Sequence, residues 1–176
     1  MHTLITRIKL SNIMTSNMDV SDLDVKILTK LSEDGRLSLR QLAKDLDIGS
    51  PVTIKNHVEN LEKKGIIKNY GAQIDYEKLG YDIIALIEIT VSKGKMLEVE
   101  ERISQNPNVF AVYDITGTYD ALIFARFKSR KELSEMIKED IHASPFVERT
   151  NTHIILNIIK EKSSLAELIK KEKKKL

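Results

Sequence analysis

Polar side chains that can hydrogen-bond to nucleic acid gather at residues 50–56 of the sequence. Thr53 and Asn56 carry groups suited to base edges, and Lys55 can reach either a base or a phosphate. Before them stand Ser50, which can cap a helix, and Pro51, which suits the first helical position. A helix that enters the major groove presents its N-terminal residues to the bases, so this pattern predicts contacts with double-stranded DNA.

Two short helices are needed to position these side chains, and residues 38–67 have the required pattern. Apolar residues recur at helical spacing over 39–46 and again over 54–61. Gly49 lies between the two stretches, in a tight turn that lets helices cross steeply, and Gly65 follows the second stretch. This order is typical of a helix-turn-helix, although an ordinary helical hairpin with a hydrated polar face has the same pattern.

A further helix is expected over residues 22–33, with Ser21 as its N-cap and Asp24 as a weak capping-box partner. Together with the two helices above it makes a three-helix unit. After Gly65 the pattern becomes extended, with apolar residues interspersed among polar ones over 66–74. We expect a strand or wing there.

The formal net charge of +2 is distributed unevenly. Residues 22–70 carry nine basic and eight acidic side chains, whereas residues 71–161 carry eleven basic and fifteen acidic ones. Bulk charge therefore does not attract the helix-turn-helix segment to DNA. Affinity must come from how its basic side chains cluster and from more than one copy of the site. Besides Lys55, those expected to contact DNA are Arg40, Lys63 and Lys64.

Composition excludes several other classes of protein. Hydrophobic residues at 41% and charged residues at 31% of 176 describe a globular chain. There is no cysteine, which excludes disulfides and a thiol nucleophile and fits a cytoplasmic setting. Residues 83–87 form a purely apolar run too short to span a membrane. The four histidines are scattered and no phosphate-binding or dinucleotide motif is present, so we expect no metal, no cofactor and no enzyme.

The second half of the chain alternates between strand and helix patterns. Strands are expected over 83–92, 109–115, 120–127 and 147–159, and helices over 96–105 and 129–143. The order β-α-β-β-α-β predicts a ferredoxin-like fold of the α+β class, with two helices on one face of a four-stranded sheet. The other face stays partly apolar, for example at Ile84, Leu86 and Phe124, so we expect at least a dimer.

Five segments follow from these patterns. We expect an extension over 1–18, a winged helix-turn-helix domain over 19–70, a linker over 71–80, the ferredoxin-like domain over 81–161 and a tail over 162–176. The tail carries six lysines against two glutamates. It is expected to be a solvated extension, with a short helix whose lysines contact DNA phosphates as the alternative.

The order of these patterns closely resembles the leucine-responsive/asparagine-type (Lrp/AsnC) family of prokaryotic transcription regulators, roughly over residues 19–160. Three stretches carry the resemblance: LDVKILTKLSEDGR, SPVTIKNHVENLEKKGIIKNY and NVFAVYDITGTYDALI. It implies dimers, often gathered into tetramers or octamers, that bind DNA through paired winged helix-turn-helix units. Relatives often have arginines in the middle of the recognition helix, where this chain has Lys55-Asn56-His57.

The resemblance also implies an amino acid effector, bound between dimers near a Gly-x-x-Asp hairpin. In this sequence the hairpin is Gly117, Thr118, Tyr119 and Asp120, and the last strand would add Thr150 and Thr152. Gly117 permits a turn whose amides can hold a carboxylate, and Asp120 offers a partner for an ammonium group. A hairpin needs a glycine and a polar residue whatever it binds, so a purely structural role stands beside this one.

Two functions remain. The favoured one is a sequence-specific regulator that docks two recognition helices into successive major grooves of a near-palindromic operator, with half-sites about 10 bp or a multiple apart. An amino acid or related metabolite would shift its assembly state. The alternative is a ligand-sensing oligomeric module that acts through protein partners rather than DNA.

Overall fold

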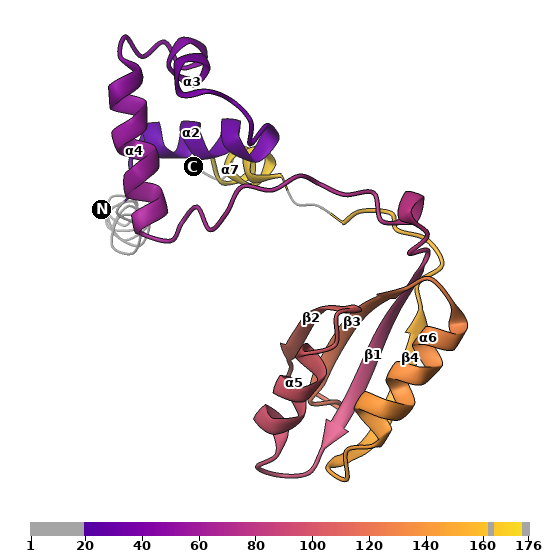
Figure 1. Cartoon of the computed structure of the whole chain (residues 1–176). Coiled ribbons are helices and arrows are strands. Elements are labelled where there is room, and N and C mark those ends of the chain that lie inside the picture. The colour runs from indigo at the N-terminus through magenta and orange to yellow at the C-terminus, as the bar shows by residue number, and fades with distance from the viewer. Residues whose placement is uncertain (1–19, 162–163, 174–176) are drawn as a thin grey trace. The chain divides into compact units, whose positions relative to one another are not determined.

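The computed structural model describes residues 20–161 and 164–173 and divides into two compact units, drawn in Figure 1. The helix-turn-helix unit contains the described residues 20–72 and 164–173. The ferredoxin-like unit is Gln73–Glu161. The expected extension over 1–18 lies outside the described residues.

Three helices form the core of the helix-turn-helix unit, as expected. They are α2 (Asp22–Glu33), α3 (Leu39–Asp45) and α4 (Pro51–Lys63). Ser21 and Asp24 close a complete capping box at the start of α2, and Ser38 caps α3. Ile27, Leu42, Ile54 and Leu61 are fully buried where the three helices meet. The apolar spacing read from the sequence therefore faces a shared core.

The turn between α3 and α4 contains a left-handed residue that was not predicted, and it lacks the side-chain cap expected from Ser50. Asp47, rather than Gly49, adopts the left-handed conformation, with φ of 54°. Ser50 makes no side-chain cap, because the amide of Thr53 bonds to the backbone carbonyl of Ser50 instead, at 3.2 Å. Gly65 ends α4 with φ of 68°, and the amide of Ile66 returns to the carbonyl of Leu61, as in a Schellman motif.

The strand expected after Gly65 does not form among the described residues. Residues 66–75 run without strand pairing within the part of the chain that the structure describes. A strand needs a neighbouring backbone to bond to, and helical or strand-like spacing within one segment does not supply it. Tyr70 instead bonds through its hydroxyl to Glu62 of α4 at 2.9 Å. Burial, followed by this bond, raises the pKa of Tyr70 to about 12.

The ferredoxin-like unit has the predicted β-α-β-β-α-β order. Its strands are β1 (Ile83–Val91), β2 (Val109–Asp114), β3 (Ala121–Phe127) and β4 (Val147–Ile154), arranged as β2-β3-β1-β4 with antiparallel neighbours. Its helices are α5 (Met96–Ser104) and α6 (Arg130–Met136), which continues as the π-helical segment η2 (Ile137–His142). A short 3₁₀ turn, η1 (Glu77–Leu79), precedes β1.

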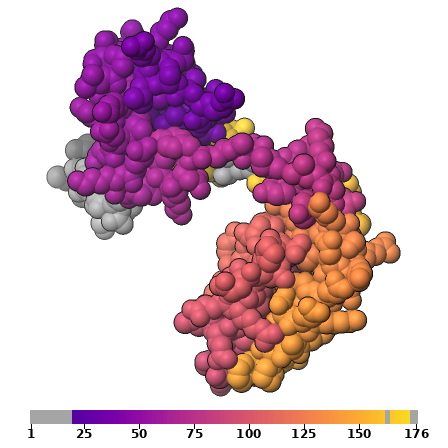
Figure 2. Space-filling view, in the orientation of Figure 1, coloured from indigo at the N-terminus to yellow at the C-terminus, as the bar shows by residue number. Residues whose placement is uncertain are grey.

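The core of this unit lies between the sheet and its helices. Alternate residues of β1, Ala85, Ile87 and Ile89, are fully buried against the helices, and Ile103 and Phe127 join them. In Figure 1 both helices lie on one side of the sheet, and their side chains occupy the side turned to the viewer in Figure 2. The other face of the sheet has no helix over it among the described residues.

The C-terminal part differs from expectation twice. β4 ends at Ile154 rather than at residue 159. The amide of Ile155 still bonds to the carbonyl of Ile84, but β1 begins at Ile83, so no further residues of β1 are available for pairing. The tail was expected to be a solvated extension. Its residues Leu165–Lys173 instead form helix α7, which lies beside α2. Partly buried Leu165, Ala166 and Ile169 recur at helical spacing on α7.

Candidate DNA-binding and effector sites

The N-terminal half of α4 carries an exposed polar ridge. Pro51, Thr53, Lys55 and Asn56 are all exposed, whereas the intervening Ile54 is fully buried. The helix therefore turns its apolar stripe inward and the predicted DNA-facing residues outward. Ser50, at the start of the ridge, is half-buried.

Val52 belongs to the same ridge, with 63% of its surface exposed, and the sequence reading missed it. A methyl-bearing side chain at this place can contact the methyl group of thymine. The available signal was its position, because Val52 lies off the apolar stripe of α4 while its neighbours Thr53 and Lys55 are polar.

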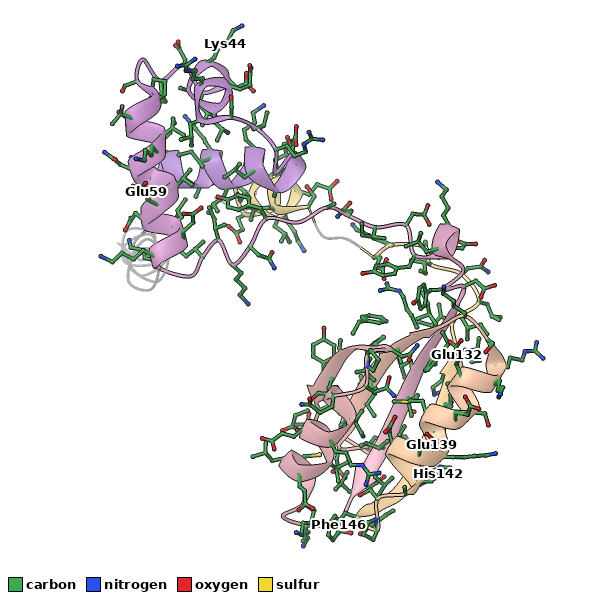
Figure 3. All side chains as sticks on the ribbon, viewed as in Figure 1. Lys44, Glu59, Glu132, Glu139, His142 and Phe146 are labelled. Carbon is green, nitrogen blue, oxygen red and sulfur yellow. The ribbon has the colours of Figure 1, made fainter. Side chains whose placement is uncertain are left out.

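The expected basic residues are exposed on two helices. Arg40 lies in the first turn of α3, Lys63 in the last turn of α4, and Lys64 directly after it. Lys55 pairs with Glu59 at 3.4 Å in an exposed contact, which costs little to exchange for a phosphate. Lys44, labelled in Figure 3 at the end of α3, projects away from the helices.

His57 does not share the outward direction of Lys55 and Asn56. Its Nδ1 atom lies 2.7 Å from Oδ1 of Asp24, a buried side chain on α2. Burial alone raises the pKa of Asp24, but hydrogen bonds from His57 and Ser21 outweigh it, so this pKa lies below its usual value. An ionised carboxylate only accepts, so the imidazole donates through Nδ1.

The hairpin between β2 and β3 has the geometry expected at Gly117, whose φ is 139°. Gly117 and Thr118 are exposed, and Tyr119 is half-buried. The guanidinium of Arg149, on β4, lies 5.8 Å from the ring centre of Tyr119. The structure thus brings the hairpin beside a cation, which suits the carboxylate of an amino acid.

The carboxylate of Asp120 is already engaged. Its Oδ2 atom accepts a hydrogen bond from the amide of Val91 at 2.8 Å, and its own amide donates to the carbonyl of Ile89 at 2.9 Å. Asp120 therefore fastens the hairpin to the end of β1. It keeps one further carboxylate oxygen that can accept from an ammonium group.

Thr150 and Thr152 point away from the side on which Arg149 lies. In the antiparallel register they stand opposite Ile89 and Ile87, so they share the helix-covered face of the sheet. Thr150 is 3.1 Å from Nε2 of His142, which ends segment η2 and is labelled in Figure 3. The sequence-based prediction noted the alternation of β4 but selected the threonines, and it missed Arg149, whose guanidinium lies beside Tyr119 of the hairpin.

The open face of the sheet is apolar towards β2 and polar towards β4. This agrees with the prediction that the open face is partly apolar. A groove of about 520 Å³ is lined there by Ile84, Phe110, Tyr113 and Phe124, together with residues of 155–161. Towards β4, Glu88 accepts from Asn151 and pairs with His153. The bonds from His153 and then Asn151 lower the pKa of Glu88.

Comparisons with known proteins agree with this architecture. Residues 20–68 match the family model described as winged helix-turn-helix DNA-binding, and residues 84–165 match the model of the Lrp/AsnC ligand binding domain. An uncharacterised HTH-type transcriptional regulator of Pyrococcus furiosus is 42% identical over 144 residues, which cover 82% of this chain and 96% of that relative.

Two solved structures are similar along most of the chain. AsnC of E. coli superposes with a TM-score of 0.79 at 26% identity, covering 84% of this chain and 99% of AsnC. A transcriptional regulator of Neisseria meningitidis in complex with L-Met gives a TM-score of 0.76 at 25% identity, covering 82% of this chain and 95% of that one. No helix among the described residues is long and apolar enough to cross a membrane. The chain matches the family models of both domains, and its alignment with the Pyrococcus furiosus regulator covers nearly the whole length of that relative. The chain therefore belongs to the Lrp/AsnC family of HTH-type transcriptional regulators.

Proposed function

We propose that this chain is a sequence-specific DNA-binding regulator whose assembly and DNA affinity respond to an amino acid. The observation that carries the proposal is the exposed ridge on α4. On this ridge, polar side chains follow one another near the N-terminus of the helix, while the opposite face of the helix is buried in the apolar core. In the proposed docking mode, bases contact Thr53, Asn56 and Val52. The phosphates contact the remaining residues, namely Ser50, Pro51, Lys55, Arg40, Lys63 and Lys64.

We propose a homodimer formed through the open face of the sheet, with tetramers or octamers built from it. Two observations support this surface: the apolar groove, and large exposed side chains around it, among them Tyr113 at 55% and Ile159 at 94%. Exposed apolar area of this kind favours association. A twofold axis duplicates the α4 ridge, which suits a near-palindromic operator with half-sites about 10 bp or a multiple apart.

The proposed effector site is the hairpin Gly117–Asp120 with Arg149. Backbone amides at the turn and the guanidinium suit a carboxylate, and the second oxygen of Asp120 suits an ammonium group. The L-Met found with the Neisseria relative makes methionine the first candidate. Thr150 and Thr152 would join only for a ligand that reaches around β4, which is an edge strand.

A gel-shift titration tests the proposal. The full chain is titrated against duplexes selected from a random library, at rising salt, with and without each of the twenty amino acids. We expect nanomolar-range binding of selected duplexes that weakens steeply with salt, and a changed shift with one class of amino acid. Equal binding of selected and scrambled duplexes at low salt, in every amino acid, would contradict the proposal and favour a protein partner.

A further inference from the structure

Helix α4 is held against the other helices by two different kinds of contact. Ile54, Val58 and Leu61 pack into the apolar core shared with α2 and α3. Such packing is not directional, so it tolerates small rotations of a helix about its own axis. The contact between His57 and Asp24 is a hydrogen bond, whose strength falls steeply when the donor turns away.

Asp24 is placed so that each of its oxygens has a separate task. Oδ2 accepts from the amide and the hydroxyl of Ser21, at 2.7 and 2.8 Å, which completes the cap of α2. Oδ1 accepts from His57 at 2.7 Å, across 33 residues of sequence. The Asp24 side chain is only 5% exposed, and that of His57 is 30% exposed. The start of α2 is thereby linked to the middle of α4.

The position of His57 on α4 connects this link to the exposed ridge. Thr53 lies four residues before His57, about one turn of helix, and Asn56 is its direct neighbour. In a rigid helix, the direction of one side chain fixes the directions of the others. A rotation that broke the 2.7 Å contact would also turn Thr53 and Asn56 away from their orientation.

We propose that His57 is a positioning residue for sequence readout. Through Asp24 it sets the rotation of α4, and so determines which base edges Thr53 and Asn56 meet, without contacting a base itself. This inference rests on the proposed DNA-binding function and adds to it a determinant of selectivity. It predicts that losing the link reduces the preference for selected DNA while the phosphate contacts, and so the affinity for scrambled DNA, remain.

Three variants of the full chain separate positioning from simple stability. His57→Ala removes the donor. His57→Asn restores one, because its side-chain nitrogen is bonded to Cγ as Nδ1 of histidine is. Ser21→Ala is the matched control, since it weakens the cap of α2 on the other oxygen of Asp24 and leaves the link to α4 in place. His57→Phe, which keeps a ring without a donor at this place, replaces His57→Ala if the alanine variant does not fold.

The measurement is the ratio of affinities for a selected and a scrambled duplex at fixed salt, together with the melting temperature. We expect His57→Ala to lower the ratio about tenfold, the size of one disrupted base contact. His57→Asn should restore it, and Ser21→Ala should lower the melting temperature with the ratio unchanged. An unchanged ratio in His57→Ala, an equal loss in Ser21→Ala, or no rescue by His57→Asn overturns the inference. No discrimination by the unaltered chain overturns the proposed function itself.

Discussion

Oδ2 of Asp120 accepts a hydrogen bond from the amide of Val91 at 2.8 Å, so the residue expected to bind an effector also holds its own hairpin in place. The bond joins the start of β3 to the end of β1, two strands that are already paired. An effector that approaches Asp120 thus meets a carboxylate whose direction is set by the sheet. Such a preorganised group loses little conformational freedom on binding.

Asp120→Ala is expected to destabilise the ferredoxin-like unit by about 1–2 kcal/mol, because the amide of Val91 loses a charged acceptor. Amino acid binding should weaken in the same variant. Thermal unfolding and calorimetric titration measure the two effects. Thr118→Ala, an exposed change in the same hairpin, is the control for stability. Equal melting temperatures for Asp120→Ala and the unaltered chain would mean that Asp120 does not hold the hairpin.

Two substitutions on α4 distinguish base contacts from phosphate contacts. Asn56→Ala should relax the sequence preference at one position and cost about 1–3 kcal/mol on the selected duplex. Lys63→Ala should weaken selected and scrambled duplexes alike and lower the salt slope by about 1. Binding curves over a range of salt concentrations measure both. If neither variant changed binding, the docking face would have been assigned to the wrong side of the unit.

The open face of the sheet is tested by charge insertion. Tyr113→Glu places a carboxylate at the edge of the apolar groove and should convert a dimer into a monomer, because the charge would be buried without a partner. Leu97→Glu is the control: Leu97 is 69% exposed on α5, a helix on the other side of the sheet. Light scattering after size exclusion gives the mass. An unchanged mass for Tyr113→Glu would show that the copies meet elsewhere.

We expect Glu100 on α5 to destabilise the fold at neutral pH. Burial, followed by the charge of Asp114, raises the pKa of Glu100, and its Oε1 atom is buried without a hydrogen-bond partner among the residues that the structure describes. A carboxyl with a raised pKa in the folded state favours folding when protonated, and this contribution is lost as pH rises through that pKa.

Glu100→Gln should therefore raise the free energy of unfolding at pH 7 by about 1 kcal/mol, with a smaller gain as the pH falls below the ordinary pKa of a glutamate and the carboxyl becomes protonated in the unfolded state as well. Melting temperatures across this pH range measure the difference. Glu101→Gln, an exposed change on the same helix, should have little effect. A gain for Glu100→Gln that did not depend on pH would exclude the raised pKa as its cause.

The turn before α4 gives a matched pair of substitutions. Asp47 has φ of 54°, a conformation that glycine adopts without strain, so Asp47→Gly should stabilise the helix-turn-helix unit by a few tenths to about 1 kcal/mol. Gly49 has no positive φ, and a methyl group built there meets no atom of the described part of the chain within 4 Å. Gly49→Ala should therefore be neutral or slightly stabilising. Chemical denaturation measures both, and a large loss in Gly49→Ala would show that the turn needs glycine there.

The sequence by itself determined the features that depend on neighbouring residues. The capping box of Ser21 and Asp24, the buried stripe of Ile54 and Val58, and the left-handed Gly65 all follow from spacings of three to seven residues. The alternation of strands and helices in the second half likewise predicted the ferredoxin-like order, since each strand or helix pattern is local. The outward direction of Thr53 and Asn56 followed from the same periodicity.

Only the tertiary structure decided which distant groups meet. His57 faces Asp24 from 33 residues away, Asp120 bonds to Val91 from 29 residues away, and Arg149 rather than Thr150 lies beside the hairpin. Residues 66–75 have the apolar spacing of a strand but do not form one. Helix α7 packs beside α2, which the sequence pattern did not predict. In each case the outcome depends on whether a partner backbone or side chain is brought within bonding distance, and periodicity along one segment carries no information about that distance.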